Sequence, residues 1–197
     1  MMGCCSKTIC HGCNYAHQKR QLEQRLERRT CPFCRHPIPK SNEEADKILI
    51  KRAEANDPVA LRFVGTTRSE EGDIKGAIEY WKKAAAMGDA EAHFQLSFLY
   101  ASGNGVEKDE KKELYHLEQA AIDGHPNARH NLGLFEWENG QDERATRHFV
   151  IAANLGDDMS IEKLKKMYQL RLCSKEDLAA ALRAHKAAVD AMKSPHR

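Results

Sequence analysis

Long apolar runs, a large net charge and an abundance of aromatic side chains are all lacking in this chain of 197 residues. No stretch approaches the roughly 20 consecutive apolar residues that span a bilayer, and the N-terminus lacks the apolar core of a secretory signal. The formal charge of +2 is too small to indicate nucleic-acid binding by itself. We therefore expect a protein without a membrane span, in a reducing compartment, cytoplasmic or nuclear.

Aromatic residues make up only 7% of the chain, and alanine is abundant from Ala60 onward. This composition favours close-packed helices over a β-sandwich. No nucleophile is paired with a base at a recognisable spacing, which argues against a self-contained metabolic enzyme. The length allows one elongated array, or one ordinary domain with a small satellite.

The sequence repeats itself from Asp57 onward. Alanine pairs mark the register, and a glycine follows each of them, with steps of 36 and then 32 residues. The pairs are Ala84-Ala85, Ala120-Ala121 and Ala152-Ala153, and the glycines are Gly88, Gly124 and Gly156. A second series has steps of 32, 36 and 32 residues: Ala60, Ala92, Ala128 and Ser160. Such a period indicates stacked structural repeats.

Each period is expected to form two helices, because apolar residues recur at helical spacing twice in it. The glycines fall where a left-handed residue closes a helix C-terminus. Asp57, Asp89 and Asp157 fall where a helix N-cap is wanted, with Pro58 and Pro126 in first-turn positions. The sequence therefore predicts an α-solenoid of helix-turn-helix repeats.

The middle repeat is longer by four residues, Gly103-Asn104-Gly105-Val106, in the turn between its helices. With Ala92-x-x-x-Leu96-Ser97-x-x-Tyr100 before it, this pattern closely resembles the Sel-one-like repeat, a relative of the tetratricopeptide repeat. The resemblance covers residues 57–172. Two positions depart from it: Glu113 replaces the small residue found at Ala77 and Ala145, and Glu136 replaces the tyrosine.

Two shorter segments flank the repeats. Residues 41–56 are polar with helical spacing, and they are either a connecting helix or a solvated linker. Residues 173–197 begin with Ser174-x-x-Asp177, a loose capping box, and continue as an alanine-rich helix. We expect this helix to cap the array, because the outer face of a terminal repeat meets water.

Six of the seven cysteines lie in the first 34 residues. Their order is Cys4-Cys5, Cys10-x-x-Cys13, a gap of seventeen residues, and Cys31-Pro32-x-Cys34. Two C-x-x-C pairs at this separation are typical of zinc binding, because each pair supplies two thiolates to a tetrahedral ion. Four sulfur ligands leave no open position for water, so the zinc would be structural.

This cluster, residues 1–40, resembles the second half of a RING finger of an all-cysteine type. By position, the resemblance implies one zinc site formed by Cys4, Cys5, Cys31 and Cys34, with Cys10 and Cys13 belonging to a second site. The first C-x-x-C pair of the family is missing here. Either the chain starts inside a longer domain that holds two ions, or a single zinc is bound, for example by Cys10, Cys13, Cys31 and Cys34.

RING domains dock a ubiquitin-conjugating enzyme and hold its ubiquitin in a reactive pose. The resemblance implies that Pro32 contacts the conjugating enzyme and that Arg35 bridges it to ubiquitin. The first hypothesis is therefore a RING-like ubiquitin ligase, or a ligase subunit, whose helical array recruits a protein substrate or partner. The second is a non-catalytic adaptor with a structural zinc site. Nucleic-acid binding through the basic N-terminal part is a third, less favoured hypothesis.

Overall fold

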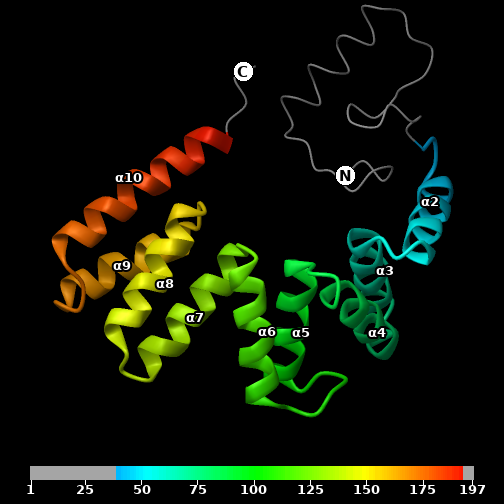
Figure 1. Ribbon diagram of the computed structural model, residues 1–197, viewed down its shortest axis with the longest axis horizontal. Coiled ribbons are helices and arrows are strands. Elements are labelled where there is room, and N and C mark those ends of the chain that lie inside the picture. The colour runs from blue at the N-terminus through cyan, green and yellow to red at the C-terminus, as the bar shows by residue number, and fades with distance from the viewer. Residues whose placement is uncertain (1–38, 193–197) are drawn as a thin grey trace, which may run out of the picture.

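The structure is a computed structural model that describes residues 39–192. Its helices follow one another in a curved row, and the row bends so that its two ends lie towards the same side (Figure 1). They are α2 (Asn42–Glu54), α3 (Pro58–Glu70), α4 (Ile74–Ala85), α5 (Ala90–Ser102), α6 (Glu110–Ile122), α7 (Pro126–Glu138), α8 (Asp142–Asn154), α9 (Asp158–Gln169) and α10 (Lys175–Met192). Residues 39–192 contain no strand. The predicted mostly α solenoid is confirmed for this part of the chain.

The helices pack as consecutive antiparallel pairs. α3 packs on α4, α5 on α6, and α7 on α8, and each pair contacts the next through its neighbouring helices. At the C-terminal end, α10 packs against both α8 and α9. Helix α2 contacts α3. For this segment the sequence allows either a connecting helix or a solvated linker, and the structure shows a helix. Every repeat is therefore covered by its sequence neighbours, as a solenoid requires.

Small side chains allow these helices to approach closely. Ala60, Ala92, Ala128 and Ser160, which mark the first helix of each repeat, are all fully buried. The alanine pairs of the second helices are buried as well. The periodic positions predicted to form the core therefore form it.

Aspartates begin most of the helices, as the sequence predicts. Asp57 accepts hydrogen bonds from the backbone amides of Val59 and Ala60, both at 3.1 Å, and Asp89 accepts one from Ala92 at 2.8 Å. Helix α7 differs, because its N-cap is His125, whose Nδ1 accepts from the amide of Ala128 at 3.2 Å. Each cap satisfies amides that have no partner within the helix.

The N-cap residues also join neighbouring repeats. Arg62 of α3 forms an ion pair with Asp89 at the start of α5, with Nε and Oδ1 3.1 Å apart. At the equivalent position of α5, the ring of Phe94 stacks on His125 with centroids 4.4 Å apart. At that of α7, His130 Nδ1 lies 3.3 Å from Asp157 Oδ2. One position in each first helix thus contacts the cap of the next repeat, which couples adjacent units.

The four-residue insertion lies where the sequence places it, in the turn between α5 and α6. Gly103 ends α5 in the left-handed conformation, at φ 75°, and Gly105 also has a positive φ of 73°. A Cβ atom on Gly105 would come within contact of the Ile74 side chain of α4. Val106 packs against the core formed by α3, α4 and α5. The longer turn therefore covers the preceding repeat.

Candidate functional site

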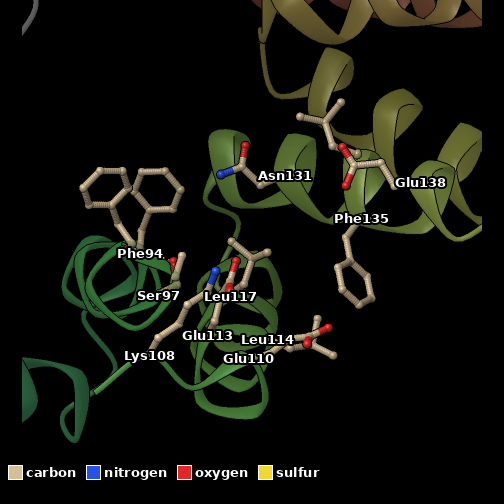
Figure 2. Close-up of a pocket in the computed structure, with 13 residues that line it drawn as sticks. Phe94, Ser97, Lys108, Glu110, Glu113, Leu114, Leu117, Asn131, Phe135 and Glu138 are labelled. Atoms are coloured by element: carbon tan, nitrogen blue, oxygen red, sulfur yellow. Dashed lines mark hydrogen bonds between the residues drawn. The ribbon is translucent and has the colours of Figure 1, made fainter. Parts of the chain in front are cut away.

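A hollow of about 460 Å³ lies between α5, α6 and α7. Figure 2 shows side chains of all three helices around it, with Phe94 and Ser97 on α5, Leu117 on α6, and Asn131 and Phe135 on α7. Concave sites lined by apolar side chains and a few polar groups are where ligands and partner segments generally bind. We take this hollow as the candidate functional site.

The hollow exists because the middle repeat has a smaller side chain in its second helix than its neighbours. Trp81 of α4 and Phe149 of α8 occupy the same repeat position as Leu117 of α6, 36 residues after Trp81 and 32 before Phe149. Both aromatic side chains are buried, Phe149 completely. Leucine fills less space than either ring, so the volume that the neighbouring repeats fill remains open here.

In the first helix of each repeat, the residue that faces this position also differs between the middle repeat and its neighbours. Gly65 faces Trp81, and Gly133 faces Phe149, each so closely that an added Cβ atom would lie 2.7 Å from the ring. The middle repeat has Ser97 at this position, and its hydroxyl donates to the Phe94 carbonyl at 2.7 Å. Glycine thus occurs opposite an aromatic ring, and serine opposite leucine.

A carboxylate enters the hollow at the position where the sequence departs from the repeat pattern. Glu113 is half-buried in the wall, whereas Ala77 and Ala145 at the same repeat position are fully buried in the core. Burial raises the pKa of the Glu113 carboxyl above its ordinary value, and the neighbouring Glu110 carboxylate acts in the same direction, while the Lys108 ammonium opposes them. The hollow therefore holds an acidic group that lacks full solvation.

The remaining wall combines charge with aromatic surface. Glu110 and Glu138 are exposed lining residues, so that three glutamates and one lysine, Lys108, surround the opening. Phe98 also lines the hollow, and 63% of its surface is exposed to solvent. Exposed aromatic surface beside polar groups is characteristic of protein interaction sites.

A second hollow lies between α8 and the turn that leads into α10. Its charged residues include Arg147 and Glu143, which pair with each other at 3.5 Å. Cys173 lines it, and burial raises the pKa of that thiol, so the thiol is less readily ionised than an ordinary cysteine. This hollow therefore offers neither the charge excess nor the aromatic surface of the first.

The site residues predicted from the sequence lie outside residues 39–192. These are Cys4, Cys5, Cys10, Cys13, Cys31 and Cys34 as zinc ligands, and Pro32 and Arg35 as contacts to a conjugating enzyme. Within the described range, no group of three or more His, Cys, Asp and Glu side chains could hold a metal ion. Helices long and apolar enough to cross a bilayer are also absent from this range. Of the residues that line the hollow, the sequence marks only Glu113, as a departure from the repeat.

Comparison with known proteins identifies the repeats. The Sel1 repeat family matches residues 61–89 and 90–125. Chitin synthase regulatory factor 4 of Schizosaccharomyces pombe is 33% identical over 86 residues, which are 43% of this chain and 14% of that protein. DAP3-binding cell death enhancer 1 of Rattus norvegicus is 25% identical over 183 residues, covering 73% of this chain and 36% of that protein. The chain thus spans well under half the length of these relatives.

Solved structures of Sel1 repeat proteins have the same fold as this chain. A Sel1 repeat protein from Oxalobacter formigenes is 31% identical, with a TM-score of 0.64 over 78% of this chain and 66% of that one. The protective antigen c5321 of uropathogenic Escherichia coli, which displays an SLR fold, shares the fold at 24% identity, with a TM-score of 0.58 over 78% of this chain and 34% of that one. Sel1 repeats generally bind protein partners. The described part of this chain is therefore a helical solenoid in which residues 61–89 and 90–125 are Sel1 repeats.

Proposed function

We propose that the chain docks a partner protein by receiving a segment of that partner in the hollow between α5, α6 and α7. The observation that carries this proposal is the hollow itself, which the neighbouring repeats fill with Trp81 and Phe149. A scaffold that needed only stability would gain from filling it, because unfilled volume costs packing energy. One relative is named for binding DAP3, which gives that protein a partner-binding role.

The chain itself supplies a variant that tests this proposal. We expect Ser97→Gly combined with Leu117→Phe to fill the hollow, since it copies the pair Gly133 and Phe149 of the next repeat. Peptides of twelve residues, selected from a random phage-displayed library on the immobilised full chain, are expected to bind the native protein. Their affinity for the filled variant, measured by titration calorimetry, should fall at least about tenfold, which corresponds to roughly 1.4 kcal/mol.

Circular dichroism serves as the control for this comparison, because the filled variant should retain the helical spectrum and be at least as thermally stable as the native chain. Two results would contradict the proposal. One is that selection on the native chain enriches no peptide family. The other is that the enriched peptides bind the filled variant as tightly as the native protein.

We further propose that residues 1–40 bind zinc and act as a RING-like docking module for a ubiquitin-conjugating enzyme, so that the array recruits the protein to be modified. The support is the spacing of Cys10-x-x-Cys13 and Cys31-x-x-Cys34 in the sequence, together with Arg35 after the last cysteine. Ligase activity would need no covalent catalysis from this chain. A zinc-dependent adaptor without ligase activity is the alternative.

Zinc content and ubiquitin transfer test this second proposal together. We expect the reduced, purified native chain to contain zinc by elemental analysis and to build ubiquitin chains with at least one of a panel of conjugating enzymes. Cys31→Ser should lower the zinc content and abolish transfer, whereas Arg35→Ala should keep the zinc and lose most of the transfer. A zinc-containing native chain that builds no ubiquitin chains would favour the adaptor. Absence of zinc would overturn both.

A further inference from the structure

We propose that the hollow between α5, α6 and α7 accepts the side chain of a lysine or arginine from a segment of the partner protein, with the aliphatic stem on the phenylalanines and the charge at the glutamates. This inference rests on the proposed docking function and specifies the chemistry of the partner. The occupant is thus a basic peptide segment, as opposed to an acidic or a wholly apolar one.

The charges around the hollow favour a cation. Glu110, Glu113 and Glu138 line it, against a single lysine, Lys108. The half-buried Glu113 makes no ion pair within 4.0 Å among the described residues, whereas Lys112 on the same helix pairs with Asp109 at 3.0 Å. A partly desolvated carboxylate gains more from an incoming cation than one in water does, because the surrounding dielectric is lower. Figure 2 shows Glu113 on α6 among the side chains that surround the hollow.

The helix ends contribute to the same potential. The hollow is lined by the last turns of α5 and α7, through Ala101 and Glu138, and by the first turn of α6, through Glu110. Two helix C-termini carry partial negative charge here, and one N-terminus carries partial positive charge. The helix backbones therefore add a negative potential to that of the glutamate side chains.

The apolar part of the wall suits the stem of the same side chain. Phe94, Phe98 and Phe135 line the hollow together with leucines of α6 and α7. Lysine and arginine lay their methylene stems along apolar surface while the charged group reaches polar groups. Their cations are also attracted to the faces of aromatic rings. A neutral polar side chain would leave this surface uncovered, and a purely apolar one would leave Glu113 without a partner.

Lys108 is the competitor for this arrangement. Its ammonium is the positive group that acts on the Glu113 carboxyl, and the lysine is exposed in the turn before α6. An incoming cation must therefore share the carboxylate with Lys108 or displace it. Removal of Glu113 and removal of Lys108 are accordingly expected to act in opposite directions, which a merely structural role of either residue would not produce.

The experiment uses the peptides selected on the native full chain and their analogues in which each lysine or arginine is replaced by norleucine, which keeps an aliphatic stem and removes the charge. We expect one such replacement to weaken binding roughly tenfold, as for loss of a charge-assisted contact. Glu113→Gln should weaken the parent peptide by a similar factor and leave the norleucine analogue unchanged. Lys108→Gln should tighten the parent peptide.

The outcomes separate the two proposals. One outcome would overturn the basic-segment inference and leave the docking function standing. In it, the peptides bind the filled variant more weakly than the native chain, but neither the norleucine replacement nor Glu113→Gln changes their affinity. Peptides that bind the filled variant unchanged would overturn the docking function itself. An opposite response to Glu113→Gln and Lys108→Gln, confined to peptides with the cation, supports the inference.

Discussion

Replacement of Gly133 by serine is expected to lower the free energy of unfolding by about 2 to 3 kcal/mol, although serine is the better helix former. A Cβ atom at this position would lie 2.7 Å from Cε1 and 2.8 Å from Cδ1 of Phe149. The Phe149 ring is fully buried and packs edge-on against Trp137, with centroids 6.4 Å apart, so it has little room to move. Urea denaturation followed by circular dichroism measures the loss.

The middle repeat shows how the same position tolerates serine. Ser97 lies opposite Leu117, so we expect Phe149→Leu to rescue much of the loss caused by Gly133→Ser, even though Phe149→Leu alone opens a cavity and destabilises the chain. The double variant should be more stable than the sum of the two single losses predicts, by about 1 to 2 kcal/mol. Additive losses would show that contact with the Phe149 ring is not the reason why glycine is required at position 133.

The helix pairs could be predicted because their signals are local and recur. The alanine pairs, the aspartates at helix starts and the glycines at helix ends each repeat at steps of 32 or 36 residues. Gly88 and Gly124 both have φ of 82°, as a left-handed C-terminal residue requires. A single proline or aspartate does not establish where a helix begins, but the same residue type recurring at the repeat spacing does.

The sequence does not indicate that His125 is an N-cap, because histidine rarely takes that role and the other repeats have aspartate there. Its ring accepts the amide of Ala128 through Nδ1, which leaves Nε2 to donate to Glu91 at 3.1 Å. That contact joins α5 to α7 and holds the pKa of the Glu91 carboxyl at about 2, chiefly through the hydrogen bond from His125. The register of the repeat was the available signal, since His125 stands 36 residues after Asp89.

The hollow could be predicted only in part. Glu113 stands out as a departure from the repeat, but a departure alone does not say whether the space around it is filled. The volume depends on Leu117 in place of Trp81 and Phe149, and on Ser97 in place of two glycines. These six positions lie on six different helices, and their relation becomes visible only once the repeats are superposed. The zinc ligands, which lie before residue 39, stay a prediction from spacing.

Acidification from pH 7 to pH 4 is expected to destabilise the array, with His116 contributing the largest single loss. Burial lowers the pKa of His116 to about 4, helped by the neighbouring His93 and Lys82. At 1.36 kcal/mol for each unit of pKa, the full difference from 6.5 would be about 3.4 kcal/mol, and the partial exposure of this ring reduces the expected loss to about 1.5 kcal/mol. Chemical denaturation at several pH values measures it.

The sign follows from which state binds the proton. Between pH 6.5 and pH 4 the unfolded chain protonates this histidine and the folded chain does not, so stability falls as the pH falls. Burial also lowers the pKa of His130 and His148, which adds to the loss in the same direction. Glu113 acts oppositely, because its pKa is raised and its protonation relieves a cost in the folded state. Glu91 adds a further loss only below pH 4.5.

The first repeat provides the matched variant for this prediction. Leu61 and Tyr80 occupy the positions of His93 and His116, so His93→Leu combined with His116→Tyr replaces a pair whose Nδ1 atoms lie 2.9 Å apart with one that the chain already uses. The Ala85 carbonyl that contacts His93 still accepts from the amide of Gly88 at 2.9 Å, so no buried acceptor is left without a partner. We expect the variant to lose about 1.5 kcal/mol of the pH dependence between pH 6.5 and pH 4. An unchanged slope would show that His116 takes up its proton in the folded array as readily as in the unfolded chain.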